Sequence, residues 1–152
     1  MPACPVFACQ PASLARARAA LLAQLPGALN PHQKGLILLA AGEVWQNIIR
    51  HGAAGGSPDS WFGFRLKQHK GRGTSRLWLT SWDSNPASNP AFNPASNPAF
   101  NPASNPASWQ GPQPGSAGGF GLLLIGRIAS QTRYQRRAGL NIAVLVFQPD
   151  RL

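Results

Sequence analysis

The first feature of this sequence that could do chemistry is a pair of polar side chains one helical turn apart. Glu43 and Asn47 are four residues apart in a segment with helical apolar periodicity, and His51 follows after another turn. Residues at this spacing project from the same face of a helix. Such side chains can exchange protons and form hydrogen bonds with a ligand. The same spacing is also common along the polar edge of an ordinary helix, and both interpretations stay open at this point.

A second feature is a carboxylate at the end of an apolar strand. Asp83 follows Leu77, Leu79 and Ser81 at even spacing, so strand alternation places it on the face that points inward. Burying an unpaired charge is costly, and the carboxylate therefore needs a donor. One interpretation is an acceptor for a ligand donor, such as the amine of adenine. The alternative is an aspartate that begins the following turn.

A third feature is the glycine-rich segment Gly118-Gly119-Phe120-Gly121, which precedes an apolar helix. Glycines at the start of a helix let backbone amides approach an anion where the helix dipole is positive. The segment follows a loop and lacks the lysine of a P-loop, so it is neither a Rossmann fingerprint nor a Walker motif. A flexible hinge explains the glycines equally well.

Three helices are expected to position these residues. The first begins at Ser13 as its N-cap and runs to about Leu25. The second is capped by Asn30, with Gln33 three residues later as in a capping box, and runs to His51. Gly52 is expected to end it. A third, short helix covers residues 122–130. The second helix carries a core-facing stripe of apolar residues, namely Ile37, Ala41, Val44 and Ile48.

Four strands are expected to form two hairpins. Residues 61–67 and 76–82 alternate in polarity and are joined by the turn Lys70-Gly-Arg-Gly73. Residues 132–137 and 141–147 form the second hairpin, which turns at Ala138-Gly139. The order of elements predicts an α/β two-layer sandwich, with a mixed sheet and helices on one face.

A low-complexity repeat separates the two hairpins. Residues 85–108 are six tandem copies of Asn-Pro-Ala-Ser or Asn-Pro-Ala-Phe. Proline at every fourth position removes a backbone donor and disfavours the helical conformation of the preceding residue. The repeat is therefore expected to form neither helix nor central strand. With the following residues to Ala117 it makes a loop of about 35 residues, which is unusual inside a compact domain.

Taken together and in this order, these segments resemble the anti-sigma factor serine kinase group of the Bergerat-fold (GHKL, histidine kinase-like) ATPases. LILLAAGEVWQNIIRHG at residues 36–52 resembles the N-box helix, LWLTSWDSNP at 77–86 the G1 box, and GGFGLLLI at 118–125 the G2 box. YQRRAGLN at 134–141 is similar to the closing hairpin. The resemblance implies one histidine kinase-like ATPase domain over residues 1–152, in which the low-complexity residues 84–118 replace the ATP lid.

The resemblance also implies a role for each candidate residue. Asn47 would coordinate the Mg²⁺ that bridges the phosphates of ATP, and Glu43 would be the general base that takes a proton from a serine hydroxyl or water. Asp83 would accept from the adenine amine. The phosphates would meet backbone amides in the glycine-rich segment, and His51 would line the same end. The residues assigned there to the nucleotide are Gly119, Gly121 and Leu122.

Three departures from the family pattern bear on activity. Asn85 stands where the G1 box has a glycine, and is tolerated because Asn visits the left-handed region more readily than most residues. The first strand, which helps the family to dimerise, is scarcely present in the proline-rich residues 1–10. Between Arg76 and Arg127 the only charged residue is Asp83, so the lid has no cation for a γ-phosphate. Phosphoryl transfer relies on such cations, and nucleotide binding is therefore the safer prediction.

The net charge of +10 suggests what the chain could bind. Cations cluster on the first hairpin (Arg65, Lys67, Lys70, Arg72, Arg76) and on the second (Arg133, Arg136, Arg137), with Trp61 and Trp78 nearby. This surface is interpreted as a solvated sheet edge, as a docking face for an acidic protein, or as a nucleic-acid surface, for which no RNP, zinc-finger or KH signature is present.

The sequence also bears on compartment. The longest apolar runs, 36–41 and 122–125, are far shorter than the roughly 20 residues that cross a bilayer, so no membrane association is expected. No signal peptide is recognised at the start. Cys4 and Cys9 have no histidine nearby and support neither a zinc site nor a disulfide scaffold. A cytoplasmic protein with reduced thiols is predicted.

Three functional hypotheses follow. The first is an ATP-dependent serine kinase and anti-sigma regulator, whose partners are a sigma factor and an anti-anti-sigma (STAS) protein, with homodimerisation left open. The second is a nucleotide-binding switch of the same fold without kinase activity. The third is a basic nucleic-acid-binding module that binds no nucleotide.

Overall fold

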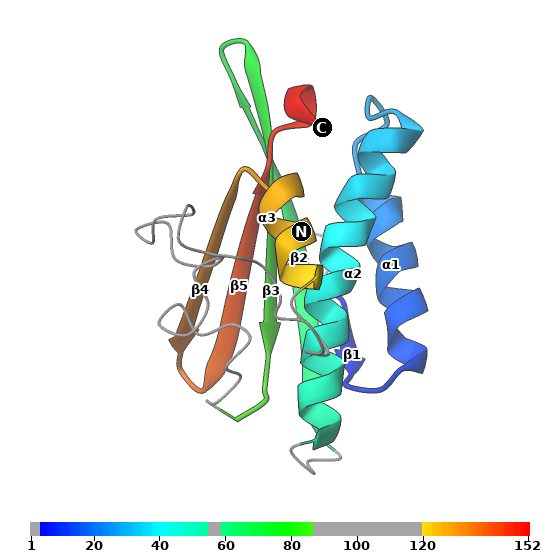
Figure 1. Ribbon diagram of the computed structural model, residues 1–152, viewed down its shortest axis with the longest axis vertical. Helices are drawn as coiled ribbons and strands as arrows, with labels where there is room; N and C mark the ends of the chain where they lie inside the picture. The colour runs from blue at the N-terminus through cyan, green and yellow to red at the C-terminus, as the bar shows by residue number, and fades with distance from the viewer. Residues whose placement is uncertain (1–3, 55–58, 87–119) are drawn as a thin grey trace.

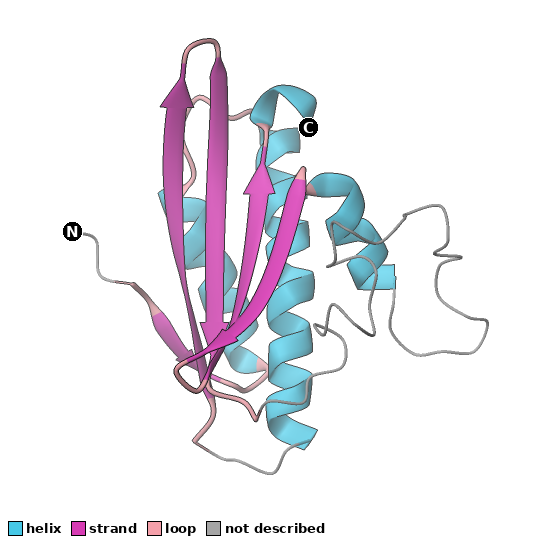
Figure 2. Cartoon of the chain, turned by 90° about the vertical axis from the view of Figure 1, so that its left-hand side faces the viewer, coloured by secondary structure: helices cyan, strands magenta, loops and turns pink. Residues whose placement is uncertain are grey.

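The computed structural model of the chain describes residues 4–54, 59–86 and 120–152, which form two layers (Figure 1). One layer is a five-stranded sheet in the order β1-β2-β3-β5-β4. The other consists of three helices on one face of that sheet. Seen from the side, the strands stand in front of the helices, and no helix of the described chain covers their opposite face (Figure 2). The predicted α/β sandwich with helices on one face is confirmed.

The three predicted helices are present as α1 (Ala12–Gln24), α2 (Pro31–Ala54) and α3 (Phe120–Ile128). The capping box of α2 forms as predicted. The Asn30 amide donates to Oε1 of Gln33, and the Gln33 amide donates to Oδ1 of Asn30, each at 2.9 Å. The apolar stripe of α2 is buried against the sheet at Ile37, Ala41, Val44 and Ile48.

Two predicted helix ends were wrong. The N-cap of α1 is Pro11 and not Ser13, because Pro11 already has helical dihedral angles. Ser13 lies inside the first turn, where its buried hydroxyl has no hydrogen-bond partner among the described residues. At the other boundary, α2 continues past Gly52 to Ala54. A Cβ on Gly52 would come within 2.9 Å of Oδ1 of Asn85 and 3.0 Å of Cβ of Cys9. The glycine therefore permits close packing and does not end the helix.

The strands form two hairpins and a short additional edge. The hairpins are β2 (Trp61–Gly71) with β3 (Thr74–Asp83), and β4 (Gln131–Arg137) with β5 (Leu140–Phe147). The first is longer than predicted, because Gly71 pairs with Thr74 and leaves only Arg72 and Gly73 in the turn, where Gly73 has a φ of 75°. A 3₁₀ turn, Pro149–Arg151, follows β5.

The sheet is antiparallel at every described pairing and not mixed as predicted. The connection through α3 brings β4 into the sheet parallel to β3, which is the arrangement that the order of elements suggests. However, β5 folds back from β4 and inserts between it and β3, so the two parallel strands never become neighbours. The prediction failed because element order does not reveal which strand of a hairpin will lie inside.

The first strand of the fold is present as β1 (Val6–Ala8), although the sequence scarcely indicates it. Three residues suffice because Phe7 points into the core and packs against Phe62, with ring centroids 5.4 Å apart. The core continues to Trp45 of α2, whose ring lies 4.9 Å from that of Phe64. The Trp45 indole also donates to the hydroxyl of Ser81 at 3.0 Å. This packing fixes α2 against β2 and β3.

Candidate functional site

Asp83 is the last residue of β3 and lies on the helix-facing side of the sheet, as strand alternation predicted. Its side chain is only 4% exposed. Oδ1 accepts two hydrogen bonds, from the Asn85 backbone amide at 3.0 Å and from Nδ2 of Asn141 at 2.9 Å. Both bonds that the described residues make to this carboxylate end on Oδ1. No described residue donates to the second oxygen, Oδ2, which can therefore accept a further hydrogen bond.

Burial raises the pKa of the Asp83 carboxyl above its ordinary value. The hydrogen bonds from Asn141 and Asn85, and the charge of Arg136, act in the opposite direction and are weaker. A buried carboxylate held by neutral donors, without a paired cation in contact, is a costly arrangement for stability alone. Perturbed carboxyl groups of this kind concentrate at functional sites.

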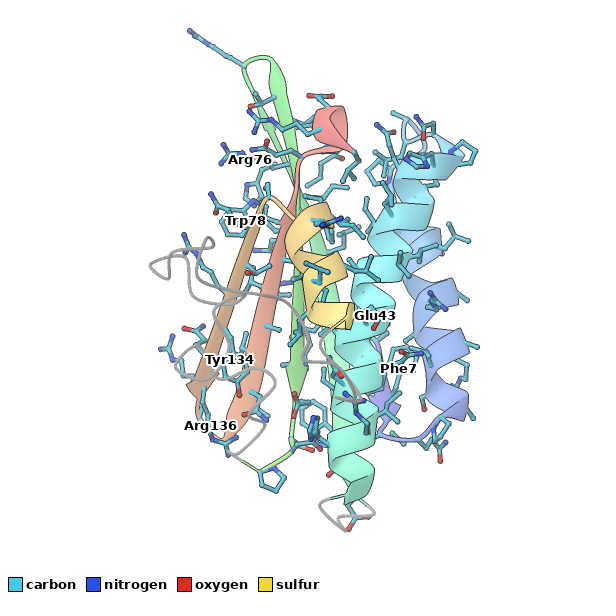
Figure 3. The ribbon with its side chains drawn as sticks, viewed as in Figure 1. Phe7, Glu43, Arg76, Trp78, Tyr134 and Arg136 are labelled. Atoms are coloured by element: carbon cyan, nitrogen blue, oxygen red, sulfur yellow. The ribbon has the colours of Figure 1, made fainter. Side chains whose placement is uncertain are left out.

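Asn141 was not among the predicted site residues, yet it connects Asp83 to the second hairpin. Besides donating to Asp83, it accepts at Oδ1 from the Tyr134 hydroxyl at 3.0 Å and from the Arg136 guanidinium at 2.7 Å. Tyr134 and Arg136 project from the same end of β4 (Figure 3). These bonds fix the orientation of the Asn141 amide, so that its nitrogen points toward Asp83. The signal in the sequence was an amide within an otherwise apolar strand.

Asn85 is part of this site, but not for the predicted reason. Among the described residues only Ala138 is a non-glycine with positive φ, so Asn85 does not use the left-handed region. Its side chain is 2% exposed and donates to the Ile48 carbonyl at 2.9 Å. Its own carbonyl accepts from Arg136 and from Asn141, each at 3.2 Å. Asn85 therefore fastens the end of β3 to α2 directly beside Asn47.

Cys9 lies on the other side of Asn85. Its thiol is 4.0 Å from Oδ1 of Asn85. Burial, followed by the nearby charge of Asp83, raises the pKa of the Cys9 thiol to about 11. Cys4 and Cys9 are both free thiols in the structure. The raised pKa makes Cys9 a packing residue and not a nucleophile at neutral pH.

Glu43 and Asn47 lie on α2, one turn apart as predicted, and Glu43 faces the start of α3. A Cβ on Gly121 would collide with the Glu43 carboxylate, coming 3.2 Å from its Cδ and closer still to Oε2. The first turn of α3 thus approaches Glu43 as closely as a backbone without a side chain permits (Figure 3). Asn47 is buried, and its amide oxygen accepts a hydrogen bond from the Arg50 guanidinium.

A family model shows to which protein family the chain belongs. The model of the histidine kinase-like ATPase domain matches residues 7–147, which is nearly the whole chain. The chain belongs to this family. Domains of the family bind ATP, typically with Mg²⁺. No curated protein matches the chain.

The residues of this histidine kinase-like ATPase domain suit ATP at the sheet end of the site. Asp83 is buried and already oriented, with Oδ2 left over for the amine of an adenine. The donor set also suits Mg²⁺ held mainly by phosphates. Within the described ranges, no group of three or more His, Cys, Asp or Glu could hold a metal by itself. Asn47 would contribute one neutral oxygen, a ligand type that Mg²⁺ accepts beside phosphates and water.

The other residues predicted to bind the nucleotide in this ATPase domain include Leu122, His51 and Gly119. Leu122 is buried in the core, so its side chain is not available to a ligand. His51 lies on α2 as predicted, but no described side chain bonds to it. Burial and the charge of Arg50 lower the pKa of His51, which is therefore neutral at pH 7. Gly119 and residues 87–118 of the predicted lid lie outside the described residues.

No helix in the described part of the chain is both long and apolar enough to cross a bilayer.

Proposed function

We propose that this domain is an ATP-binding regulator of the anti-sigma factor serine kinase type, which holds a sigma factor and acts on an anti-anti-sigma (STAS) partner. The observation that carries the proposal is Asp83, a buried carboxylate whose Oδ1 is fixed by Asn85 and Asn141. Asn85 joins this carboxylate to α2 at Ile48, so Glu43 and Asn47 belong to the same site. The sequence resemblance of residues 36–52 supports the anti-sigma assignment within the wider family.

Each side chain has a role in this proposal. Asp83 accepts the adenine amine at Oδ2, and Asn141 holds Asp83 in position. Asn47 would supply one neutral oxygen to Mg²⁺, in place of the hydrogen bond that it accepts from Arg50. Glu43 takes the proton of a serine hydroxyl on the partner as general base. The bound ATP with its metal supplies the phosphoryl group and part of the charge stabilisation that its transfer requires.

Arg50 strengthens the case for the phosphate end. The lid carries no Lys or Arg, but the structure places the Arg50 guanidinium on Asn47. A cation beside the metal ligand can offset part of the negative charge of the phosphates. Arg50 is the one Arg or Lys that the hydrogen bonds of the described residues attach to Asn47. Its replacement by Met is therefore expected to weaken ATP binding more than binding of adenosine.

The first experiment is calorimetric titration of ATP and ADP, with Mg²⁺, into the wild type, Asn47→Ala and Asp83→Asn. We expect the wild type to bind both nucleotides and each substitution to weaken binding at least tenfold. Adenosine without metal separates the two variants, since only Asp83→Asn should affect it. A wild type that binds no adenine nucleotide would overturn the proposal.

The second experiment tests kinase activity against nucleotide switching. Radiolabelled ATP is incubated with the domain and a panel of STAS proteins, beside Glu43→Gln. Transfer of phosphate to a STAS serine that Glu43→Gln abolishes, with ATP affinity kept within threefold, supports the kinase. Binding of Mg-ATP without transfer to any member supports the alternative, a nucleotide-binding switch, which the lack of a lid cation favours.

A further inference from the structure

The side of the sheet that faces away from the helices has a regular pattern of residues, and we call it the outer face (Figure 2). Alternation assigns its members, because their neighbours along each strand pack in the helix-side core. The pairing registers place Arg65, Thr80, Val144 and Arg133 in one row across four strands. The adjacent row consists of Lys67, Trp78, Val146 and Gln131.

The middle of the outer face is an apolar floor. It is formed on β3 and β5 by half-buried or buried side chains, namely Trp78, Trp82, Ile142, Val144 and Val146. Trp82 lies across β2, where a Cβ on Gly63 would come within 2.8 Å of the indole nitrogen. His69 packs beside Trp78, with ring centroids 5.5 Å apart. Val146 is 1% exposed and does not belong to the helix-side core.

Cations flank this floor on both sides. Arg65 and Lys67 stand on β2, and Arg133 and Arg137 stand on β4, all of them exposed. Trp78 and Arg76 project to the side away from α1 and α2 (Figure 3). The described strands carry only one acidic residue, Asp83, and it faces the helices. The positive charge of the outer face is therefore not neutralised by the protein itself.

The width of the apolar floor indicates which kind of partner segment fits on it. Strands β2 and β4 are separated by three inter-strand spacings, or about 14 Å between the two rows of cations. An α-helix with its side chains is about 10–12 Å across. One helix therefore fits along the floor between the cationic rows. Its apolar stripe would meet the tryptophans and valines, and acidic residues on both flanks would meet the arginines.

We propose that the outer face docks an acidic amphipathic helix of a partner protein. Trp and Arg are the residues enriched at the centres of protein interfaces, around which polar residues form a rim. A second copy of this chain is disfavoured as occupant, because it carries 14 Lys and Arg against 4 Asp and Glu and would place like charges opposite each other. A nucleic acid suits the cations but not the aliphatic half of the floor. This surface is separate from the nucleotide site.

The test uses a fluorescein-labelled designed peptide of about 20 residues, with Leu along one stripe and Glu on both flanks. Its affinity for the full chain is measured by fluorescence anisotropy at low salt. The variant Arg65→Glu/Arg133→Glu reverses one cation on each side of the floor. The matched control, Arg16→Glu/Arg151→Glu, reverses two exposed cations on α1 and the 3₁₀ turn and gives the same net charge. Circular dichroism verifies that both variants fold.

We expect the outer-face variant to weaken peptide binding at least tenfold and the control to change it less than twofold. A scrambled peptide of the same composition should bind at least tenfold more weakly than the designed one. Equal loss in both variants, equal binding of the scrambled peptide, or no binding by the wild type would each overturn the proposal. So would an oligouridylate that displaces the peptide at lower concentration, or an Arg65- and Arg133-dependent dimer in light scattering.

Failure of this proposal is distinguishable from failure of the proposed function. Asp83→Asn is expected to lose ATP affinity and to keep its affinity for the peptide within twofold, because Asp83 lies on the opposite face of the sheet. Arg65→Glu/Arg133→Glu is expected to keep its ATP affinity within twofold. If Asp83→Asn also lost the peptide, the two surfaces would not be separate and the proposal as stated would be wrong.

Discussion

In the proposed site, the end assigned to adenine (the adenine end) and the end assigned to the phosphates (the phosphate end) are built in different ways. At the adenine end, Asp83 and Asn141 lie on adjacent strands and are buried. One hydrogen bond joins them to each other, and four more link them to Asn85, Tyr134 and Arg136. At the phosphate end, Glu43 and Asn47 come from one helix and Gly121 from another. The described residues join that end by one side-chain hydrogen bond, from Arg50 to Asn47, and by close packing of Gly121 on Glu43.

This difference indicates what each half contributes before a ligand arrives. A fully bonded polar network on a sheet is rigid, and it can discriminate one base from another because its donors and acceptors are fixed. The phosphate end depends on the relative placement of α2 and α3. We therefore expect substitutions at the adenine end to affect affinity most strongly and those at the phosphate end to affect it less.

The largest effect is expected from Asp83→Asn. The substituted amide can keep its oxygen toward Asn85 and Asn141, so the fold is retained, but its nitrogen then faces the adenine amine, donor against donor. ATP affinity should fall about a hundredfold, since a site built around one hydrogen-bonding group strongly rejects its mismatch. Calorimetry with ATP and GTP provides the measurement. The ratio of ATP affinity to GTP affinity should also become smaller, because the new amide can donate to the carbonyl of guanine.

The result that would contradict this comparison is a variant that loses ATP and GTP equally while remaining folded. In that case Asp83 would not contact the base, and the adenine end would have to lie elsewhere.

A smaller effect is expected from Asn141→Ala. It removes one donor from Asp83 and leaves Tyr134 and Arg136 without their shared acceptor. Unfolding free energy should fall by about 1–3 kcal/mol, because the buried Asp83 carboxylate loses one of its two donors. ATP affinity should fall about tenfold. Chemical denaturation and calorimetry measure the two quantities.

Tyr134→Phe is the matched control for Asn141, because it deletes only the outermost of these bonds and keeps the ring. We expect its ATP affinity to stay within threefold of the wild type. An effect as large as that of Asn141→Ala would mean that the network acts through Tyr134 and not through the orientation of the amide.

The two ends also differed in how far the sequence could predict them. Glu43, Asn47 and the capping box of α2 follow from local spacing, because residues three or four apart on a helix are neighbours whatever the rest of the chain does. The inward orientation of Asp83 follows from strand alternation. Its partner Asn141 is 58 residues away, and no local pattern pairs them. The pairing depends on β5 inserting next to β3, which is also why the predicted mixed sheet was wrong.

The departures at Asn85 and Gly52 have the same explanation. Each was interpreted from backbone conformation, as a residue for the left-handed region and as a helix stop. In the structure both are determined by one tertiary contact, in which Gly52 leaves room for the Asn85 side chain and Asn85 bonds to Ile48. Sequence patterns report what a residue permits locally, but they do not reveal which distant atom it meets.

At the phosphate end, Gly121→Ala is expected to have a moderate effect. The new methyl group would overlap the Glu43 carboxylate, so α3 or Glu43 must move. Overpacking of this kind costs about 1–3 kcal/mol, and ATP affinity should fall several-fold as the two helices separate.

Gly126→Ala is the control on the same helix, because no atom lies within 4 Å of its added Cβ. That variant should be more stable than the wild type by about 0.5–1 kcal/mol. Equal thermal stabilities of the two variants would refute the close approach of α3 to Glu43.

The ionisation of Asp83 is expected to have a smaller effect, which would be seen in how the free energy of unfolding depends on pH. Because burial raises the pKa of Asp83, the folded state holds this proton more tightly than the unfolded state. The stability of the wild type relative to Asp83→Asn should therefore fall as pH rises from the ordinary pKa of an aspartate through the raised one, and then level off. Denaturant unfolding of both proteins across this range gives the difference, in which other titrating groups cancel. If the stability of the wild type relative to Asp83→Asn rose with pH, the hydrogen bonds and the charge of Arg136 would lower the pKa of Asp83 more than burial raises it.

The smallest effect is expected from removing most of the repeat, and it sharpens the boundary between the site and the lid. Asn85, the first residue of the repeat, is buried and bonded, whereas the tetrapeptides that follow lie outside the described residues. Replacing residues 87–108 by a short Gly/Ser linker should leave ATP affinity within a few fold. Asn85→Ala should weaken ATP binding more, because it removes the hydrogen bond from Asn85 to the Ile48 carbonyl. That bond holds the end of β3 against α2. Asn89→Ala, which changes the same residue type one tetrapeptide later, is the control and should have no effect. A tenfold loss in the linker variant, about 1.4 kcal/mol, would instead place the repeat in the closed nucleotide site.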